Sequence, residues 1–300
     1  MGSTVKIHKA KLIDGFANIF SLNGFDLNAM SSPLVYKYDK YRYLSGCFKK
    51  NCLAFVSPKL WTDPFERRFL QTNYKSFGFT VPEIACMCLS KSSNENEEAL
   101  WSLRSTKKQG QDKKINKDKV IRLTLNIRTL LKQLDKLASK ESFRVYVANV
   151  NYALKNSEIL NLHDIKSPYY NVFFGSDPKQ FDISNYLNLL LLKRKSFKYE
   201  NEIRIIIVKE GQLFNYNNGV FEACFLDKSI INKIVRRIVV EPCNRLDDYN
   251  QLIVKDDYYA TINQEEHSLY YETIKKMPGI ASSIPVVKSK LYEGTMLLQI

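Results

Sequence analysis

The chain has 300 residues, of which 45 are Lys or Arg and 31 are Asp or Glu, so its formal net charge is +14. A hydrophobic content of 45% and a charged content of 25% are ordinary for a globular protein and argue against disorder. A chain of this length buries about three quarters of the surface of its unfolded state. It therefore needs neither disulfides nor a structural metal for stability.

The apolar runs are too short for a membrane span of about 20 residues. The first twenty residues lack the apolar stretch of a signal peptide. The 6 cysteines are scattered without the spacing of a zinc site, and only 3 histidines are present. We therefore expect a cytoplasmic protein with reduced thiols, no metal and no membrane contact.

Hydrophobic periodicity predicts an irregular mixture of strands and helices. Residues 1–32 look like a lead-in with a turn at Asn23-Gly24, and 33–300 like a single domain. Strands are expected at 34–38, 53–57, 84–89, 120–125, 143–149 and 203–208, with two strand-like runs in 284–300. Helices are expected at 41–51, 95–103, 127–137, 181–193 and 246–254, and a helix followed by a strand at 230–241. This order favours an α+β fold rather than regular βαβ alternation.

A basic insertion occupies about 104–122, with eight Lys or Arg against two Asp. It reads as a solvated loop, and the net charge favours a polyanionic partner. We expect nucleic-acid contacts from its first basic residues, which are Arg104, Lys107, Lys108, Lys113 and Lys114. The alternative is that the charge only reflects a Lys-rich composition.

Four places carry side chains suited to chemistry, and none contains a Gly-rich phosphate loop. The first three are Tyr36-Lys37-Tyr38 in a strand, Ser57 at a strand end before Asp63-Pro64-Phe65-Glu66, and Trp101. Each has a plain structural reading, as an exposed strand lysine, a turn or a core aromatic residue.

The fourth place is Glu200-x-Glu202-x-Arg204, just before an apolar strand. Side chains two apart in a strand share a face, so both carboxylates and Arg204 project together if the strand begins as early as Glu200. Two carboxylates on one face are strained unless a cation lies between them, and Arg204 is the expected cation. The trio is then either a surface ion-pair set or a pair of carboxylates that divide catalytic work.

A basic residue on an early strand, a serine at a second strand and the E-x-E motif before a later strand occur in an order that resembles the ADP-ribosyltransferase fold. From Val35 to Ile300 the chain also resembles an uncharacterised bacterial family that reads K-Y-R, S-S-P-x-x-F-N-D-P-F-E, C-x-x-S…W-x-x-Y and W-x-Y-E-x-E-Y-R. That family is related to ADP-ribosyltransferases and often lies near phage-defence genes. The resemblance implies a split antiparallel or mixed sheet with flanking helices. The chain departs from it at Asp39, Thr62 and Phe197, and lacks the aromatic residue after Trp101.

The resemblance implies NAD as co-substrate and assigns roles to the residues that match. Glu202 would stabilise the positive ribose, and Glu200 would activate the acceptor. Lys37 or Arg42 would hold the pyrophosphate or ribose, Ser57 would bind the nicotinamide end and align Glu202, and Tyr38 and Trp101 would line the pocket.

The implied protein is a toxin-like effector of phage defence that modifies RNA or DNA, with a possible antitoxin or defence-system partner. Two alternatives stay open. One is a non-catalytic nucleic-acid-binding protein on the same fold. The other is a metal-dependent nuclease in which Asp63, Glu66, Glu200 and Glu202 gather around Mg²⁺.

Overall fold

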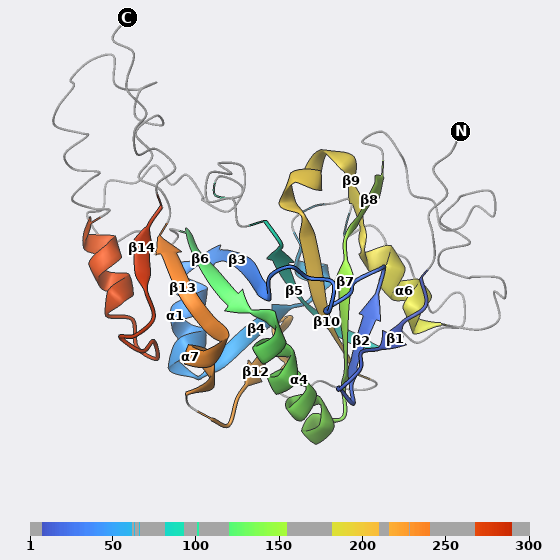
Figure 1. Ribbon diagram of the computed structural model, residues 1–300, viewed down its shortest axis with the longest axis horizontal. Helices are drawn as coiled ribbons and strands as arrows, with labels where there is room; N and C mark the ends of the chain where they lie inside the picture. The colour runs from blue at the N-terminus through green and yellow to red at the C-terminus, as the bar shows by residue number, and fades with distance from the viewer. Residues whose placement is uncertain are drawn as a thin grey trace, which may run out of the picture. The chain divides into compact units, whose positions relative to one another are not determined.

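The computed structural model describes residues 8–61, 63, 66, 82–92, 101, 120–154, 182–209, 216–227, 229–240 and 268–289 (Figure 1). The chain forms two compact units. Unit 1 comprises Met1–Pro33, Leu53–Lys91 and Ile127–Ala223, and unit 2 comprises Leu34–Cys52, Ser92–Asn126 and Cys224–Ile300. Within the described ranges, none of the helices has the length and apolar character that crossing a bilayer requires.

Unit 1 is built on a mixed sheet whose centre is β10 (Glu202–Lys209), flanked by β7 (Arg144–Asn149) and β5 (Glu83–Ser90), both antiparallel to it. Next to β7 lies β2 (Ile19–Leu22), which runs parallel to it, and then β1 (Lys11–Leu12). On the other side, β4 (Cys52–Val56) pairs with β5, and β12 (Val220–Cys224) pairs with β4 and with β11 (Tyr216–Asn217). Residues expected to be a lead-in thus supply two strands of this sheet.

Among the described residues of unit 1, the helices α4 (Ile127–Glu141) and α6 (Ile183–Leu190) pack against the sheet. In α4, apolar residues recur every three or four positions and are buried, and α4 packs against β7. The carboxylate of Asp135 accepts backbone hydrogen bonds from Ala17 and Asn18, at 3.1 and 2.7 Å, and so ties the segment before β2 to α4. The second helix, α6, begins at Asp182, whose side chain accepts a hydrogen bond from the Ser184 amide.

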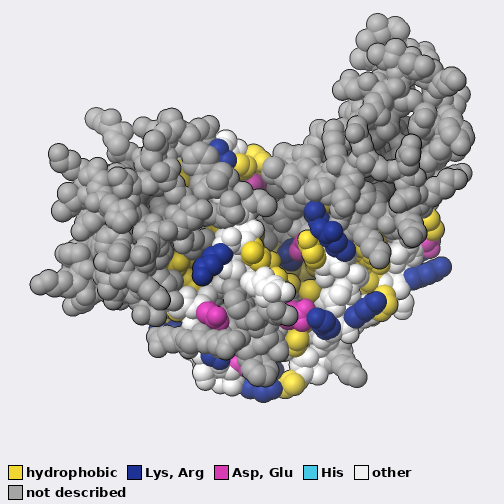
Figure 2. All heavy atoms as spheres, turned by 180° about the vertical axis from the view of Figure 1, so that it is seen from behind, with side chains coloured by type: hydrophobic (Ala, Val, Ile, Leu, Met, Phe, Trp, Pro, Cys, Tyr) yellow, Lys and Arg dark blue, Asp and Glu magenta, His cyan; other side chains and the backbone are white. Residues whose placement is uncertain are grey.

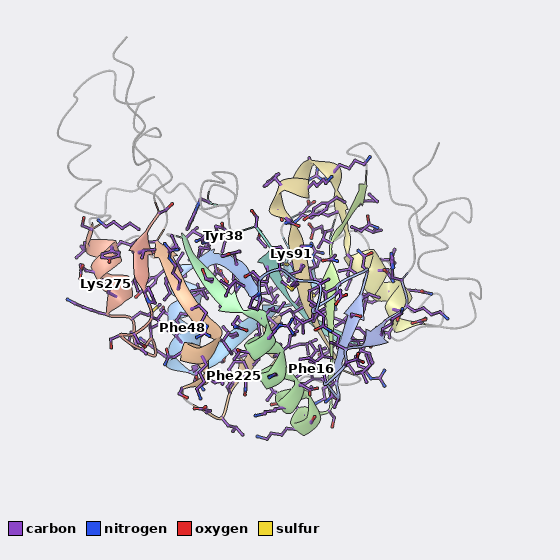
Figure 3. The ribbon with its side chains drawn as sticks, viewed as in Figure 1. Phe16, Tyr38, Phe48, Lys91, Phe225 and Lys275 are labelled. Carbon is purple, nitrogen blue, oxygen red and sulfur yellow. The ribbon has the colours of Figure 1, made fainter. Side chains whose placement is uncertain are left out.

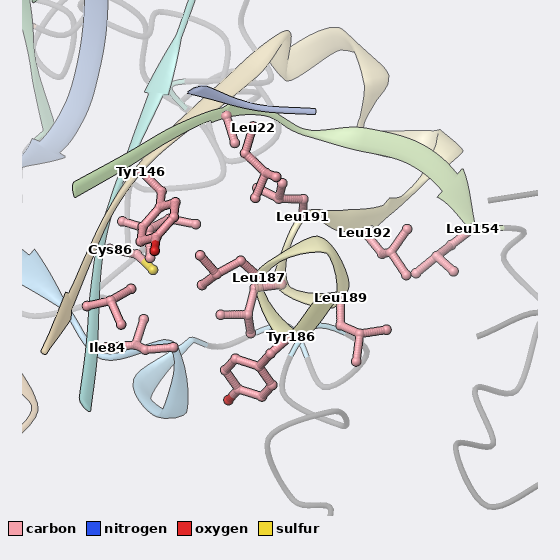
Figure 4. Packing of buried hydrophobic residues seen from close by; sticks show 14 residues of the cluster. Leu22, Ile84, Cys86, Tyr146, Leu154, Tyr186, Leu187, Leu189, Leu191 and Leu192 are labelled. Carbon is pink, nitrogen blue, oxygen red and sulfur yellow. The ribbon is translucent and has the colours of Figure 1, made fainter. Parts of the chain in front are cut away.

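A leucine-rich cluster joins α6 to the sheet of unit 1 (Figure 4). Leucines of α6 pack with Tyr146 of β7 and Cys86 of β5. The expected helix 181–193 ends early, because Leu192–Arg194 form β9, which pairs in parallel with β8 (Asn151–Leu154). The run Leu189–Leu192 is apolar throughout, so its periodicity could not locate the helix end.

Unit 2 contains a second group of strands. In it β3 (Leu34–Lys40), β6 (Val120–Asn126) and β13 (Val235–Val240) are antiparallel neighbours, and β14 (Val286–Lys288) runs parallel to β13. Its described helices include α1 (Tyr41–Lys49), α7 (Ile230–Ile234) and a helical segment at 268–275. Gly279, at φ +86°, lies against the end of α1, and a Cβ there would meet the Phe48 carbonyl oxygen at 2.2 Å.

The α+β class is confirmed, and both units have mixed sheets. The expected strands at 34–38, 53–57, 84–89, 120–125, 143–149 and 203–208 occur within one or two residues of their predicted ends. The expected helix at 246–254 lies outside the described residues, as do 104–119 of the basic insertion and all of the helix at 95–103 except Trp101, which is helical. Arg122, expected at the end of a solvated loop, lies in β6 with 1% of its surface exposed.

Candidate functional site

The residues that lead into β10 place the two glutamates of the E-x-E motif differently from the sequence expectation. Glu200 ends a 3₁₀-helix, η4 (Lys195–Glu200), and Asn201 then adopts a left-handed conformation with φ 42°. Asparagine is among the non-glycine residues that tolerate this conformation. Only Glu202 and Arg204 therefore share a strand face, and Glu200 reaches the same place from the preceding turn.

Five charged side chains meet beneath this turn and form the carboxylate cluster, which consists of Glu66, Lys193, Glu200, Glu202 and Arg204. The Nζ of Lys193 lies 2.6 Å from Glu200 Oε2, 2.8 Å from Glu202 Oε2 and 3.3 Å from Glu66 Oε1. All five residues are buried, with exposed fractions of 8% or less. Lys193, and not Arg204, is thus the cation that lies between Glu200 and Glu202.

Arg204 is the most deeply buried residue of the cluster. Its Nε donates to Glu202 Oε1 at 2.7 Å, one terminal nitrogen donates to Glu66 Oε2 at 2.8 Å, and the other donates to the Leu190 carbonyl. The guanidinium carbon lies 4.3 Å from the centre of the Trp61 ring, a cation–π contact. Its side chain is 1% exposed, while those of Glu200 and Lys193 are 11% and 10% exposed. Glu200 and Lys193 therefore lie nearer to solvent than Arg204.

The cluster keeps Glu202 and Lys193 charged. Burial by itself would raise the pKa of Glu202, but the Arg204 and Lys193 charges outweigh it and hold that pKa well below its ordinary value. Burial would lower the pKa of Lys193, but the carboxylates of Glu202 and Glu66 raise it above its ordinary value. Glu202 and Lys193 are therefore both ionised at neutral pH.

Two neutral groups border Glu202. Burial, reinforced by the Glu202 carboxylate, raises the pKa of the Cys88 thiol to about 12. Cys88 pairs with Arg204 across the β5–β10 ladder and hydrogen-bonds to Glu202. The hydroxyl of Tyr152, on β8, accepts a hydrogen bond of 2.8 Å from the Glu202 amide, and burial raises its pKa. Both groups stay protonated and fix Glu202 in place.

The cluster has one more negative charge than positive charges, since three carboxylates face two cations. The neighbouring pair of Arg194 and Asp63, at 3.2 Å, is neutral and does not change this balance. Carboxylates that share one ammonium lie within about 6 Å of each other, so two of them repel by about 3 kcal/mol at an effective dielectric constant near 20. Such an arrangement favours positive charge that develops beside it.

Ser57 follows β4, and the sheet register sets it apart from Glu202. Val56 pairs with Cys86, which pairs with Ile206, four residues or about 13 Å along β10 from Glu202. The Ser57 hydroxyl instead caps the short helix η1 (Pro58–Leu60) by accepting a hydrogen bond from the Lys59 amide. This register does not place Ser57 beside Glu202, so a role of Ser57 in aligning Glu202 stays a prediction.

The other expected cofactor-binding residues belong to unit 2. Lys37 is 7% exposed, and its ammonium forms an ion pair of 2.6 Å with Asp39, the residue that departs from the bacterial family. Because side chains alternate along a strand, Tyr38 projects from the face of β3 opposite to Lys37. Tyr38, labelled in Figure 3, makes an edge contact with Trp101 in an apolar cluster. Lys37 therefore does not share one pocket wall with Tyr38 and Trp101.

Arg42 is exposed on α1, and its guanidinium lies 4.8 Å from the ring centre of the adjacent Tyr43. The five residues expected to contact nucleic acid, Arg104, Lys107, Lys108, Lys113 and Lys114, lie outside the described residues. Figure 2 shows described Lys and Arg side chains at several places on the one face that it presents.

No pattern in the sequence places Lys193, Cys88 or Tyr152 in the site, and Glu66 was placed in a loop motif and in the alternative metal site. Lys193 follows an apolar run in an expected helix, so its local sequence gives no sign of a partner. Glu66 was named among possible metal ligands, and it does join Glu200 and Glu202, but around an ammonium.

No protein-family model, curated protein or solved structure matches the chain.

Proposed function

We propose that the protein is an ADP-ribosyltransferase that uses NAD to modify a macromolecular acceptor, preferably RNA or DNA. The observation that carries the proposal is the buried pair of carboxylates, Glu200 and Glu202, joined by one ammonium in a cluster with surplus negative charge. Cleavage of the nicotinamide–ribose bond creates positive charge on the ribose. Ionised, immobile carboxylates are suited to stabilising that charge.

In this mechanism the bond between the ribose C1′ and the nicotinamide nitrogen breaks, and its electron pair leaves with nicotinamide. Glu202 remains ionised and stabilises the developing cation. Glu200, which lies nearer to solvent, orients the acceptor hydroxyl or amine and accepts its proton as the new bond to C1′ forms. Arg204, which packs against the Trp61 ring, holds Glu202 in place by donating a hydrogen bond to its carboxylate.

The remaining parts of the proposal rest on the sequence. The basic insertion at about 104–122 would dock a nucleic-acid acceptor, and the resemblance to the bacterial family suggests a cytoplasmic, toxin-like effector of phage defence, silenced or assisted by a partner protein. The pairing of Lys37 with Asp39 gives Lys37 an internal partner, so a phosphate bound by that lysine would share the ammonium with the Asp39 carboxylate.

A metal-dependent nuclease is supported less well by the cluster. Glu66, Glu200 and Glu202 do converge, but the point where they converge holds the ammonium of Lys193. Because these carboxylates raise the pKa of Lys193, the ammonium keeps its proton, and a divalent ion at the same point would be repelled.

The test is a transfer assay with NAD labelled in its adenylate half, offered with total RNA, fragmented DNA or cell lysate. Wild type and Glu202→Gln are compared, with Lys195→Gln as a control for loss of a nearby exposed charge. The proposal predicts label in one acceptor pool with wild type and the control but not with Glu202→Gln. Retention of RNA or DNA without any loss of NAD would instead support the non-catalytic binding protein.

A further inference from the structure

Lys193 enters the carboxylate cluster from an element other than those that carry its partners. It is the middle residue of β9, which follows α6 and pairs with β8. The preceding residues, Leu190, Leu191 and Leu192, are almost completely buried in the cluster of Figure 4. The backbone at Lys193 is therefore held in place by the packing of these leucines, which does not involve the carboxylates.

The ammonium of Lys193 has three N–H donors, and three carboxylate oxygens lie within 3.3 Å of it. The contact to Glu200, at 2.6 Å, is the shortest. Glu200 belongs to η4 and Glu202 to β10, with the left-handed Asn201 between them. Lys193 thus bridges two carboxylates that no shared strand face holds together.

Other groups around Lys193 define its surroundings. The ring centre of Phe197 lies 5.2 Å from its Nζ. Among the described residues, the titratable and charged groups that face the bridge from neighbouring elements are Arg204 of β10, Cys88 of β5, Tyr152 of β8, and Glu66. Arg204 is the cation of this group, and it contacts Glu202 and Glu66. Lys193 contacts Glu200 directly, at 2.6 Å, as well as Glu202 and Glu66.

We propose that Lys193 is the positioning residue of the site, which holds the Glu200 carboxylate beside that of Glu202 until the acceptor arrives. This inference rests on the proposed function, because it assigns Glu200 its role through Lys193. Lys193 acts through the carboxylates and does not take part in the bond changes.

The test measures NAD turnover against pH for Lys193→Gln, Lys193→Met and Lys193→Arg, with Lys195→Gln as the matched control. Removal of the charge lets the carboxylates repel, so the acid limb of the kcat profile moves upward by about one pH unit and kcat near neutral pH falls by about tenfold. Lys193→Arg restores the position of the acid limb, and KM for NAD changes little. An equal loss in all three variants at every pH, with the acid limb unmoved, would overturn the inference.

A second readout separates this inference from the proposed function. The titration of glutamate side chains labelled with ¹³C at Cδ is followed by NMR in wild type and Lys193→Gln. We expect one glutamate resonance to titrate at higher pH in the variant, whether or not NAD is consumed. If NAD is not consumed but this shift occurs, only the proposed function fails. If the glutamate titration is unchanged, the positioning role of Lys193 is refuted.

Discussion

Replacement of Arg204 by methionine tests the energetic account of the carboxylate cluster. Methionine has a similar reach and fits apolar surroundings, but it removes the guanidinium that contacts Glu202 and Glu66. Among the described cations, Lys193 is then the one that still contacts both buried carboxylates. Breaking a buried ion pair by removing one partner costs about 3–5 kcal/mol. A Coulomb interaction of about 4 kcal/mol for charges about 4 Å apart at a dielectric constant near 20 agrees with that range.

The assay is urea unfolding followed by circular dichroism and tryptophan fluorescence, since Trp61 contacts Arg204. The matched control is Arg194→Met, which removes a cation from the more exposed pair with Asp63, whose side chains are 22% and 17% exposed. For this control the free energy of unfolding should fall by only about 1 kcal/mol or less. If the free energy of unfolding fell equally in the two variants, burial of Arg204 would not be the reason that its removal is destabilising.

The same pair of proteins gives a pH dependence with a definite sign. The pKa of Glu202 is lower in the folded protein than its unfolded value of about 4.3, so its ion pairs contribute stability above that pH. This contribution is lost as the pH falls through and below about 4. The difference in the free energy of unfolding between wild type and Arg204→Met should therefore narrow on acidification. A difference that widens towards low pH would contradict the ionised state of Glu202.

Three further predictions concern single positions. Gly279→Ala should lower the free energy of unfolding by at least about 2 kcal/mol, because the new Cβ would overlap the Phe48 carbonyl at a residue with positive φ. The control is Gly46→Ala in α1, where a Cβ would have no neighbour within 4 Å. In the same unfolding assay this control should be neutral or stabilising. Asp135→Ala should lower the free energy of unfolding by about 1–3 kcal/mol and speed backbone hydrogen exchange near β2, because two backbone amides lose their acceptor. An unchanged rate of hydrogen exchange would refute the contact. The Cys88 thiol, whose pKa is raised to about 12, should react with iodoacetamide at pH 8 much more slowly in the folded protein than in the unfolded protein. Peptide mass spectrometry measures the two rates, and equal rates would contradict the protonated state of this thiol.

Local patterns were sufficient to predict most of the strands. Runs such as Ile203–Val208 and Val120–Leu125 are rich in β-branched residues, and both form buried strands. Residues 1–32 have weaker runs, and β2 exists because it pairs with β7, more than 120 positions away along the chain. Pairing at that distance leaves no local signal.

The candidate site was predictable in part. The E-x-E spacing identified Glu200 and Glu202, but its interpretation as one strand face failed because Asn201 turns the chain. The bridging role of Lys193 depends on packing of α6 and β9 against the sheet, which no spacing near Lys193 encodes. The pairing of Lys37 with Asp39 was available from the sequence, since residues two apart on β3 share a face.

The proposed function requires Glu202 to stabilise the ribose cation as the bond between nicotinamide and ribose breaks. The most direct measurement is the release of nicotinamide from NAD, quantified by chromatography, in the presence of the acceptor pools, with wild type, Glu200→Gln, Glu202→Gln and Lys195→Gln. We expect release with wild type and Lys195→Gln, and loss of nearly all release with Glu202→Gln. No release by any of the four proteins, or equal release by wild type and Glu202→Gln, would contradict the proposed function.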